Sequence, residues 1–216
     1  MKNLDLFSNA GAAATKESAP LAEKMRPQNL SEYIGQSHLL GDGCLLRRTI
    51  EEDRLFSMIL WGPPGSGKTT LARILANETK SKFISFSAVL SGVKEIRAVI
   101  DEAGQLRREK NKKTVLFVDE IHRFNKAQQD AFLPHVESGL ITLIGATTEN
   151  PSFEVIAPLL SRTRVLMLKP FSEEELITIV KRALKDEQKG LGKYYVWMDE
   201  GALRYVVHVS DGDARN

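Results

Sequence analysis

One stretch of eight residues constrains the fold of this chain more than any other. Residues 62–69 read Gly-Pro-Pro-Gly-Ser-Gly-Lys-Thr, which matches the pattern G-x-x-x-x-G-K-[S/T]. A short apolar run, Met58–Trp61, precedes it, and residues with helical periodicity follow it from Lys68 to Thr79. A strand, a glycine-rich turn and a helix in this order predict an α/β fold with the turn at the carboxyl end of a buried strand.

The same turn predicts a phosphate-binding site. Glycines let backbone N–H groups turn inward around phosphates, and the N-terminus of the following helix favours anions. Lys68 supplies a positive charge for the β- and γ-phosphates, and the Thr69 hydroxyl is a ligand for Mg²⁺. The sequence therefore predicts that this turn binds ATP together with Mg²⁺. The expected nucleotide contacts from this turn are Gly62, Pro63, Pro64, Gly65, Ser66, Gly67, Lys68, Thr69 and Thr70.

Strand-like and helical segments alternate from Met58 to about residue 170. The expected strands are Met58–Trp61, Phe83–Phe86, Val115–Val118, Ile141–Ala146 and Val165–Leu168. The expected helices are Lys68–Thr79, Val93–Lys110 and Ala127–Val136. Continuous apolar strands separated by helices predict an α/β domain with a parallel five-stranded sheet and helices on both of its faces.

The pattern changes after Pro170. Ser172 and Glu175 have the spacing of a capping box, and two helices are expected, Glu173–Asp186 and Asp199–Val209. No further strand is expected after Pro170. The two helices therefore predict the start of a small helical lid domain.

Three parts are therefore expected: a disordered leader over residues 1–20, an α/β domain over 21–170 and a partial helical lid domain over 171–216. Asp213 resembles the N-cap of a helix that would continue beyond Asn216, so we interpret the chain as a piece of a longer protein.

Two carboxylates follow the apolar strand Val115–Val118. Asp119 is expected to hold Mg²⁺ through water, and Glu120 to act as the general base that polarises the attacking water. Neighbouring side chains on a strand point to opposite sides, which would let the two carboxylates divide this work. Without the phosphate-binding turn, the same residues would indicate only a strand that enters a loop.

Hydroxyl groups at two other strand ends are candidates for the same site. Thr148 is the predicted contact to the γ-phosphate, with Thr147 as the alternative; a turn capped by Thr and Asn is the other interpretation. Ser87 is a candidate to hydrogen-bond Glu120 and hold it away from water, unless it is simply a hydroxyl at the end of a strand.

Two arginines are predicted to reach the γ-phosphate. Arg162 is the candidate to act on the nucleotide of a neighbouring subunit, and an ordinary surface arginine is the alternative. Arg215 falls in the first turn of the helix expected after Asp213. Because a cation there opposes the helix dipole, an anion such as the γ-phosphate of the same subunit is expected to attract it.

The charge of the chain is nearly balanced. Lys and Arg total 30 against 28 Asp and Glu, so any DNA-binding surface has to be local. Arg107–Lys113 is the densest basic run, either a solvated helix end or a phosphate contact. Arg123 and Lys126 are the candidates that would couple DNA to Glu120. The single cysteine and the lack of an apolar run of about 20 residues predict a cytoplasmic protein.

These motifs in this order resemble those of an AAA+ ATPase. Arg26-Pro27 and Tyr33–Gln36 resemble the segment that contacts adenine in clamp loaders and in the Holliday-junction motor RuvB. This resemblance implies nucleotide contacts from Arg26, Ile34 and Gly35. Ser161–Thr163 resembles the clamp-loader arginine-finger motif with Thr in place of Cys, and Gly212–Arg215 resembles the second sensor.

Three longer stretches, Ser91–Arg97, Asp119–Asp130 and Gly145–Glu154, resemble the RarA/MgsA family, bacterial relatives of Werner helicase-interacting protein. The resemblance covers about Pro20 to the end. It implies a DNA-dependent ATPase that acts at stalled replication forks in replication, recombination and repair, is stimulated by DNA ends or gaps, and is associated with the nucleoid. It also implies a homo-oligomer, because members of the family continue into further lid helices and an oligomerisation region.

The leader contains one more resemblance. Asn3–Phe7 is similar to the Gln-Leu-x-Leu-Phe peptide that binds the bacterial sliding clamp, with Asn in place of Gln. The alternative is that its apolar residues pack on the domain.

Two other classes of function remain open at this point. The first is a nucleotide-switched scaffold recruited to the sliding clamp or to fork proteins. The second is a P-loop kinase, which the adjacent Asp119 and Glu120 disfavour because they suit water as the acceptor.

Overall fold

The computed structural model describes residues 19–87 and 92–215. The chain divides into two units: Pro27–Ser172 is one, and Met1–Arg26 with Glu173–Asn216 is the other. The peptide Asn3–Phe7 and all but the last two residues of the predicted leader lie outside the described residues. In the part of the chain that the structure describes, no helix combines the length and apolar character needed to cross a membrane.

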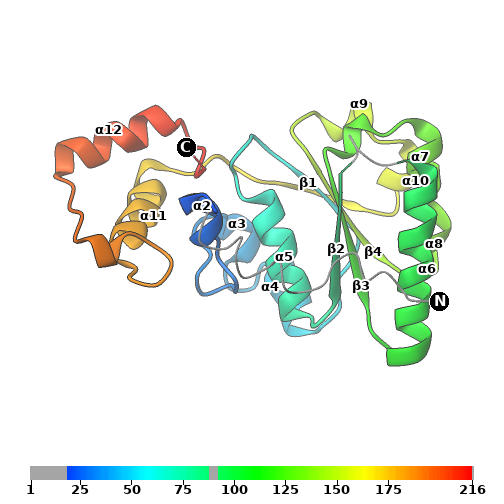
Figure 1. The fold of residues 1–216 in the computed structure, drawn as a ribbon. Helices are drawn as coiled ribbons and strands as arrows, with labels where there is room; N and C mark the ends of the chain where they lie inside the picture. Colours follow the sequence, from blue (N-terminus) through cyan, green and yellow to red (C-terminus); the bar gives the residue numbers. More distant parts are fainter. Residues whose placement is uncertain (1–18, 88–91, 216) are drawn as a thin grey trace. The chain divides into compact units, whose positions relative to one another are not determined.

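The unit Pro27–Ser172 is built on a parallel five-stranded sheet with the strand order β2-β3-β4-β1-β5 (Figure 1). The strands are β1 (Met58–Trp61), β2 (Lys82–Ser87), β3 (Thr114–Asp119), β4 (Thr142–Thr147) and β5 (Arg164–Met167). The predicted α/β fold class and the predicted number of strands are confirmed.

The register aligns the carboxyl ends of the strands along one edge. Trp61, the last residue of β1, pairs with Thr147 of β4 and with Met167 of β5. On the other side of β4, Ser87 of β2 pairs with Asp119 of β3. The residues that follow the strands therefore meet at the edge where ligands bind in open α/β sheets.

Helices cover both faces of the sheet, with α4 and α5 on one side and α6, α7, α8 and α10 on the other (Figure 1). The helices of this unit are α3 (Ser37–Leu40), α4 (Leu45–Glu51), α5 (Lys68–Glu78), α6 (Val93–Lys110), η1 (Ile121–Arg123), α7 (Lys126–Asp130), α8 (Leu133–Glu137), α9 (Pro151–Glu154) and α10 (Ala157–Leu160).

The expectation of one helix over Ala127–Val136 is wrong, because α7 and α8 are separate. Pro134 explains the break. It has no N–H to donate to the carbonyl of Asp130, and it occupies one of the first two positions of α8, where a missing N–H is tolerated.

The packing of strand β3 on both faces of the sheet explains why its sequence is apolar without interruption. Leu116 and Val118 pack into the hydrophobic cluster on one face of the sheet, and Val115 and Phe117 pack into the cluster on the other face. All four side chains are at most 1% exposed. At about 1.5–3 kcal/mol for each buried side chain, their burial contributes roughly 6–12 kcal/mol before opposing terms. This fixes the strand that carries Asp119.

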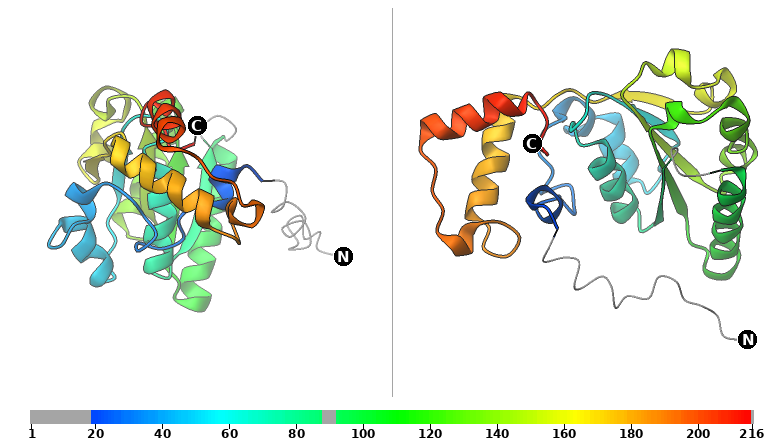
Figure 2. Two further views of the ribbon diagram at one scale, coloured as in Figure 1. Left: turned by 90° about the vertical axis from the view of Figure 1, so that its left-hand side faces the viewer. Right: turned by 45° about the horizontal axis from the view of Figure 1, so that its top comes forward.

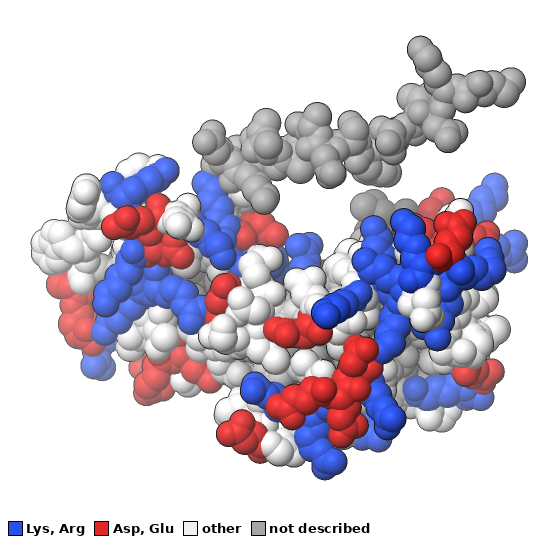
Figure 3. Space-filling model, turned by 90° about the horizontal axis from the view of Figure 1, so that it is seen from below, with Lys and Arg blue, Asp and Glu red and all other residues white. Residues whose placement is uncertain are grey.

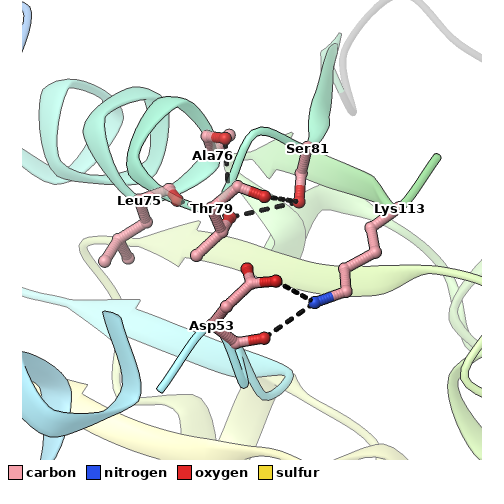
Figure 4. Close-up of polar contacts among 6 residues, drawn as sticks. All are labelled: Asp53, Leu75, Ala76, Thr79, Ser81 and Lys113. Carbon is pink, nitrogen blue, oxygen red and sulfur yellow. Dashed lines mark hydrogen bonds and ion pairs between the residues drawn. The ribbon is translucent and has the colours of Figure 1, made fainter. Parts of the chain in front are cut away.

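The opposite, amino-terminal ends of β2 and β3 are fixed by polar contacts (Figure 4). Thr79, the C-cap of α5, donates its hydroxyl to the Leu75 carbonyl at 2.8 Å and lies 3.1 Å from the Ser81 hydroxyl. Lys113 donates to the backbone carbonyl and to the carboxylate of Asp53, both at 2.7 Å. One cation of the basic run Arg107–Lys113 is therefore bound to an acidic neighbour.

The other unit is helical in its described part. It contains α2 (Leu21–Lys24), α11 (Glu173–Lys185), η2 (Gly192–Tyr194) and α12 (Glu200–Ser210). Figure 2 shows α11 and α12 in orange and red. Leu176 of α11 and Leu203 and Val207 of α12 are buried. The two helices expected after Pro170 are confirmed.

Candidate nucleotide-binding site

Two glycines of the turn between β1 and α5 are required for different reasons. Gly67 is the N-cap of α5 and has φ 93°, a left-handed conformation that side chains with a Cβ rarely adopt. Gly62 continues from β1, and a Cβ there would lie 2.4 Å from the Leu168 carbonyl oxygen. The first glycine of the motif is thus required by close packing and the third by backbone conformation.

Lys68 is fixed inside this turn. It is 8% exposed, and its Nζ donates to the carbonyls of Gly62 and Pro63, both at 2.8 Å. A buried ammonium group without such acceptors would be strongly unfavourable. Ser66, which is fully buried, donates to the Pro63 carbonyl at 2.9 Å and closes the turn from the other side.

The turn fits a phosphate group. Helix α5 has no acidic residue in its first turn, so the positive end of its dipole meets no carboxylate of its own. Lys68 adds a full charge at the same point. In the described part of the chain, no three His, Cys, Asp or Glu side chains form a metal cluster. A Mg²⁺ ion that binds with a nucleotide needs only one or two protein ligands, which fits the half-buried Thr69 and Asp119.

Glu120 does not continue the strand. Asp119 is the last residue of β3, whereas Glu120 has φ 54° and ψ 47° and precedes the short 3₁₀ helix η1. The alternation of side chains along a strand therefore does not set the direction of Glu120, and this part of the sequence argument is wrong. A left-handed residue with a side chain costs about 1–2 kcal/mol, so the surrounding structure has to hold it in place.

His122 links Glu120 to the next strand, a role that the sequence analysis missed. Its Nε2 lies 3.3 Å from Glu120 Oε2, and its Nδ1 lies 2.9 Å from Thr147 Oγ1. The available signal was its position two residues after Glu120, in the turn that leaves β3. Ser87, in contrast, makes no hydrogen bond to Glu120 among the described residues, so that hypothesis is not supported.

The two candidate threonines after β4 differ in their surroundings. Thr147 is fully buried, and its hydroxyl accepts a hydrogen bond from the backbone N–H of Glu149 at 3.0 Å. Thr148 is half-buried beside it. The structure therefore brings Thr147 into the polar group around Glu120, while Thr148 stays the predicted contact for the γ-phosphate.

Gln36 ties the segment before β1 to the turn. Its amide nitrogen donates to the carbonyl of Lys169 at 2.8 Å and lies 3.4 Å from that of Ser66, and its oxygen accepts from the Lys169 N–H at 3.0 Å. Gln36 is 4% exposed. These bonds bring the preceding residues, Ile34 and Gly35, close to the turn, and sequence reasoning did not assign Gln36 a role.

Residues 58–171 match the family described as "ATPase family associated with various cellular activities (AAA)". The chain belongs to this AAA family.

Curated relatives narrow this assignment. Replication-associated recombination protein A of Coxiella burnetii is 58% identical over 91% of the chain, and that of Escherichia coli K12 is 53% identical over 91%. ATPase WRNIP1 of Dictyostelium discoideum is 48% identical over 93%. The predicted membership of the RarA/MgsA family is confirmed. The chain spans 44% of the length of the first two relatives and 23% of the third.

A solved structure shares the fold of this AAA domain. Thermotoga maritima RuvB, described as the Holliday junction branch migration motor, superimposes with a TM-score of 0.71 at 30% identity. The match covers 89% of this chain and 62% of RuvB.

The arginines predicted to reach the γ-phosphate are bound to nearby acidic residues. In the AAA domain, Arg162 forms an ion pair with Glu137 and donates to the Pro158 carbonyl at 2.8 Å. In the helical unit, Arg215 forms an ion pair with Asp213 at 2.7 Å, and its backbone N–H donates to Asp213 Oδ1 at 2.8 Å. Arg26, which also belongs to that unit, is paired with Glu23.

The candidate DNA contacts of the AAA domain lie on its surface. Arg123 and Lys126 are exposed, and the backbone N–H of Arg123 donates to the Glu120 carbonyl at 2.8 Å. The basic run Arg107–Lys113 ends α6 and leads into β3. Figure 3 shows Lys and Arg side chains gathered around this end of α6, with acidic side chains among them.

Proposed function

We propose that this chain binds ATP with Mg²⁺ at residues 62–70 and hydrolyses it as the ATPase domain of a protein that acts on DNA during replication and recombination. The observation that carries the proposal is Lys68, which is buried in the glycine turn and held there by two backbone carbonyls. A buried cation at a helix N-terminus that lacks acidic residues is suited to a polyphosphate.

Each residue of the site has a distinct role in the proposed reaction. Lys68 binds the β- and γ-phosphates, and Thr69 and Asp119 hold the Mg²⁺ ion that neutralises phosphate charge. Glu120 takes a proton from water as the water oxygen bonds to the γ-phosphorus. The bond from that phosphorus to the β-phosphate oxygen breaks, which leaves ADP and inorganic phosphate. Thr148 hydrogen-bonds the γ-phosphate.

Efficient hydrolysis depends on assembly in this proposal. Arg162 leaves Glu137 and contacts the γ-phosphate bound to a neighbouring copy, while Arg215 approaches the γ-phosphate of its own chain. The Arg162–Glu137 ion pair is exposed, and exposed pairs contribute only about 0–1 kcal/mol, so Arg162 can be recruited at a small energetic cost. Asp213 is 17% exposed and binds Arg215 through both carboxylate oxygens, so Arg215 is held more firmly.

The proposal that the protein acts on DNA rests on the relatives and on the hydrogen bond between the Arg123 N–H and the Glu120 carbonyl. Replication-associated recombination protein A and RuvB both carry names that refer to recombination or to branched DNA. Arg123 and Lys126 would bind phosphates of forked, gapped or blunt-ended DNA. Because the Arg123 backbone is bonded to Glu120, DNA bound there is placed to influence the base. Recruitment to the sliding clamp through Asn3–Phe7 completes the proposed set of partners.

The test measures ATP binding and turnover for the wild type, Lys68→Ala and Glu120→Gln, over a range of protein concentrations and with forked, gapped and blunt DNA. Lys68→Ala is expected to lose ATP binding. Glu120→Gln is expected to keep it and to lose roughly 10²–10⁴-fold in turnover. Undiminished turnover in Glu120→Gln would refute the assignment of the base.

Two further outcomes separate the proposal from its alternative. DNA stimulation that is lost in an Arg123→Ala/Lys126→Ala variant supports these DNA contacts, and equal DNA affinity of that variant and the wild type contradicts them. ATP binding with no turnover under any condition would favour the nucleotide-switched scaffold.

A further inference from the structure

Three polar side chains form a connected line at the carboxyl edge of the sheet. His122 lies in the middle, with Nε2 3.3 Å from Glu120 Oε2 and Nδ1 2.9 Å from Thr147 Oγ1. The Thr147 hydroxyl in turn accepts the backbone N–H of Glu149 at 3.0 Å. The line joins the end of β3 to the end of β4 through one residue of η1.

For an ionised carboxylate and a neutral ring, chemistry sets the direction of these contacts. An ionised carboxylate only accepts, so a hydrogen on Nε2 of His122 suits the 3.3 Å contact with Glu120 Oε2. In the neutral ring Nδ1 is then an acceptor, and the Thr147 hydroxyl donates to it. The Glu149 carbonyl, 3.3 Å away, is a competing acceptor for the single hydrogen of that hydroxyl. When this hydrogen faces the ring, every donor in the line points toward Glu120.

The burial of Thr147 stabilises this set of contacts. Thr147 is fully buried, and a buried hydroxyl that loses its partner is left unsatisfied, which destabilises the fold. The backbone of Glu120 is held in its left-handed conformation by the turn in which the Arg123 N–H donates to the Glu120 carbonyl at 2.8 Å. With both ends anchored, the imidazole ring is placed to contact the Glu120 carboxylate.

We propose that His122 is a positioning residue, which holds the carboxylate of Glu120 in place to accept a proton from water and transmits to it the position of the end of β4. The inference rests on the proposed function, because it concerns the same hydrolytic step. Thr148, the proposed γ-phosphate contact, directly follows Thr147. A nucleotide that moves Thr148 therefore moves the residue to which the His122 ring is bonded.

The geometry does not favour His122 as the base itself. Its side chain is 14% exposed, against 34% for Glu120, and both of its ring nitrogens face protein groups. Water reaches the carboxylate more readily than the ring. The role of His122 is thus exerted through Glu120.

The kinetic test compares His122→Ala, His122→Gln and Thr147→Val with the wild type in turnover and in ATP affinity. His122→Ala is expected to lower kcat by about 10–100-fold, because a displacement of about 1 Å in a reacting group has effects of this size. KM for ATP is expected to change little, since no ATP contact is lost. His122→Gln, which keeps an N–H donor, is expected to restore most of kcat. His135→Ala serves as the matched histidine control.

A double variant tests the connection to β4. If His122 and Thr147 act in one line, His122→Ala/Thr147→Val is no slower than His122→Ala alone, whereas the effects of independent sites multiply. Multiplied effects, or wild-type kcat in His122→Ala, would overturn the proposal.

A spectroscopic measurement tests the arrangement of the His122 ring without measuring hydrolysis. ¹⁵N NMR of the His122 ring is expected to show the neutral tautomer with hydrogen on Nε2 in the wild type, and a loss of this fixed tautomer in Thr147→Val. A ring with hydrogen on Nδ1 would contradict the line. The two proposals fail separately: full turnover in Glu120→Gln removes the base, whereas full turnover in His122→Ala with a dead Glu120→Gln removes only the positioning role.

Discussion

The lysine in the glycine turn and the two arginines proposed to assist hydrolysis are held in opposite ways. Lys68 is 8% exposed and bonded to backbone carbonyls that cannot move away from it without unfolding the turn. The side chains of Arg162 and Arg215 are 39% and 63% exposed and paired with the carboxylates of Glu137 and Asp213. Under the proposed function, Lys68 is already fixed in its binding position, whereas Arg162 and Arg215 would have to leave their present partners.

The largest expected effect concerns Arg162. Arg162→Ala is expected to leave ATP affinity unchanged and to lower turnover by roughly 10³–10⁵-fold at protein concentrations where wild-type turnover rises with concentration. The reason is that an arginine on the γ-phosphate acts on the transition state. Turnover and ATP titration are measured side by side, with the exposed Arg97→Ala as the control. Equal turnover of Arg162→Ala and the wild type would show that Arg162 is only a surface residue.

A substitution of Gln36 tests whether the glycine turn that holds Lys68 is preorganised. Gln36→Ala removes an amide that bonds both backbone groups of Lys169, and leaves those groups without this partner. The expected loss is about 1–3 kcal/mol of unfolding free energy, together with weaker ATP binding. Urea unfolding measures the first and ATP titration the second. A Gln36→Glu variant, which buries a carboxylate against the Lys169 and Ser66 carbonyls, should lose at least as much. Unchanged stability in Gln36→Ala would mean that the turn is fixed without this contact.

Releasing Arg162 should have a smaller effect of the opposite sign. Glu137→Ala removes an exposed ion pair worth about 0–1 kcal/mol, which corresponds to at most about fivefold. Turnover is therefore expected to reach its half-maximum at a several-fold lower protein concentration. The control is Glu154→Ala on α9. A loss of turnover would indicate that Glu137 positions Arg162 rather than competing for it.

The smallest effect is expected at Asp186 in the helical unit. Backbone N–H groups of Lys189, Gln188 and Gly190 lower the pKa of this exposed carboxyl below its usual value, an effect that outweighs its slight burial. A lowered folded pKa contributes stability above the unfolded pKa, and this contribution is lost as pH falls from about 4 through the folded value.

Asp186→Asn keeps the acceptor but removes the charge. The stability difference between wild type and variant, measured by thermal denaturation, is therefore expected to be present at pH 7 and to shrink below about pH 4. Glu187→Gln is the neighbouring control. A difference that stays constant with pH would mean that the charge is not involved.

The sequence was sufficient wherever a function depends on neighbours along the chain. Residues 62–69 are contiguous, and the turn they form is set by glycine conformation and by the strand and helix on either side. The apolar run of β3 likewise marked Asp119 and Glu120 as strand-end carboxylates. Such local signals can be recognised without knowledge of the strand order in the sheet. This is why the fold class and these candidate residues were predictable.

Only the tertiary structure decided the contacts that join distant segments. Thr147 meets His122 because β3 and β4 pair in a parallel register, and Gln36 meets Lys169 across 133 positions because the segment before β1 packs against the end of β5. The direction of Glu120 also depends on a left-handed residue that strand alternation does not foresee. By itself the sequence indicated the candidate groups for phosphate binding and water activation; the packed sheet decided what holds them, because hydrogen bonds between side chains depend on distances in space.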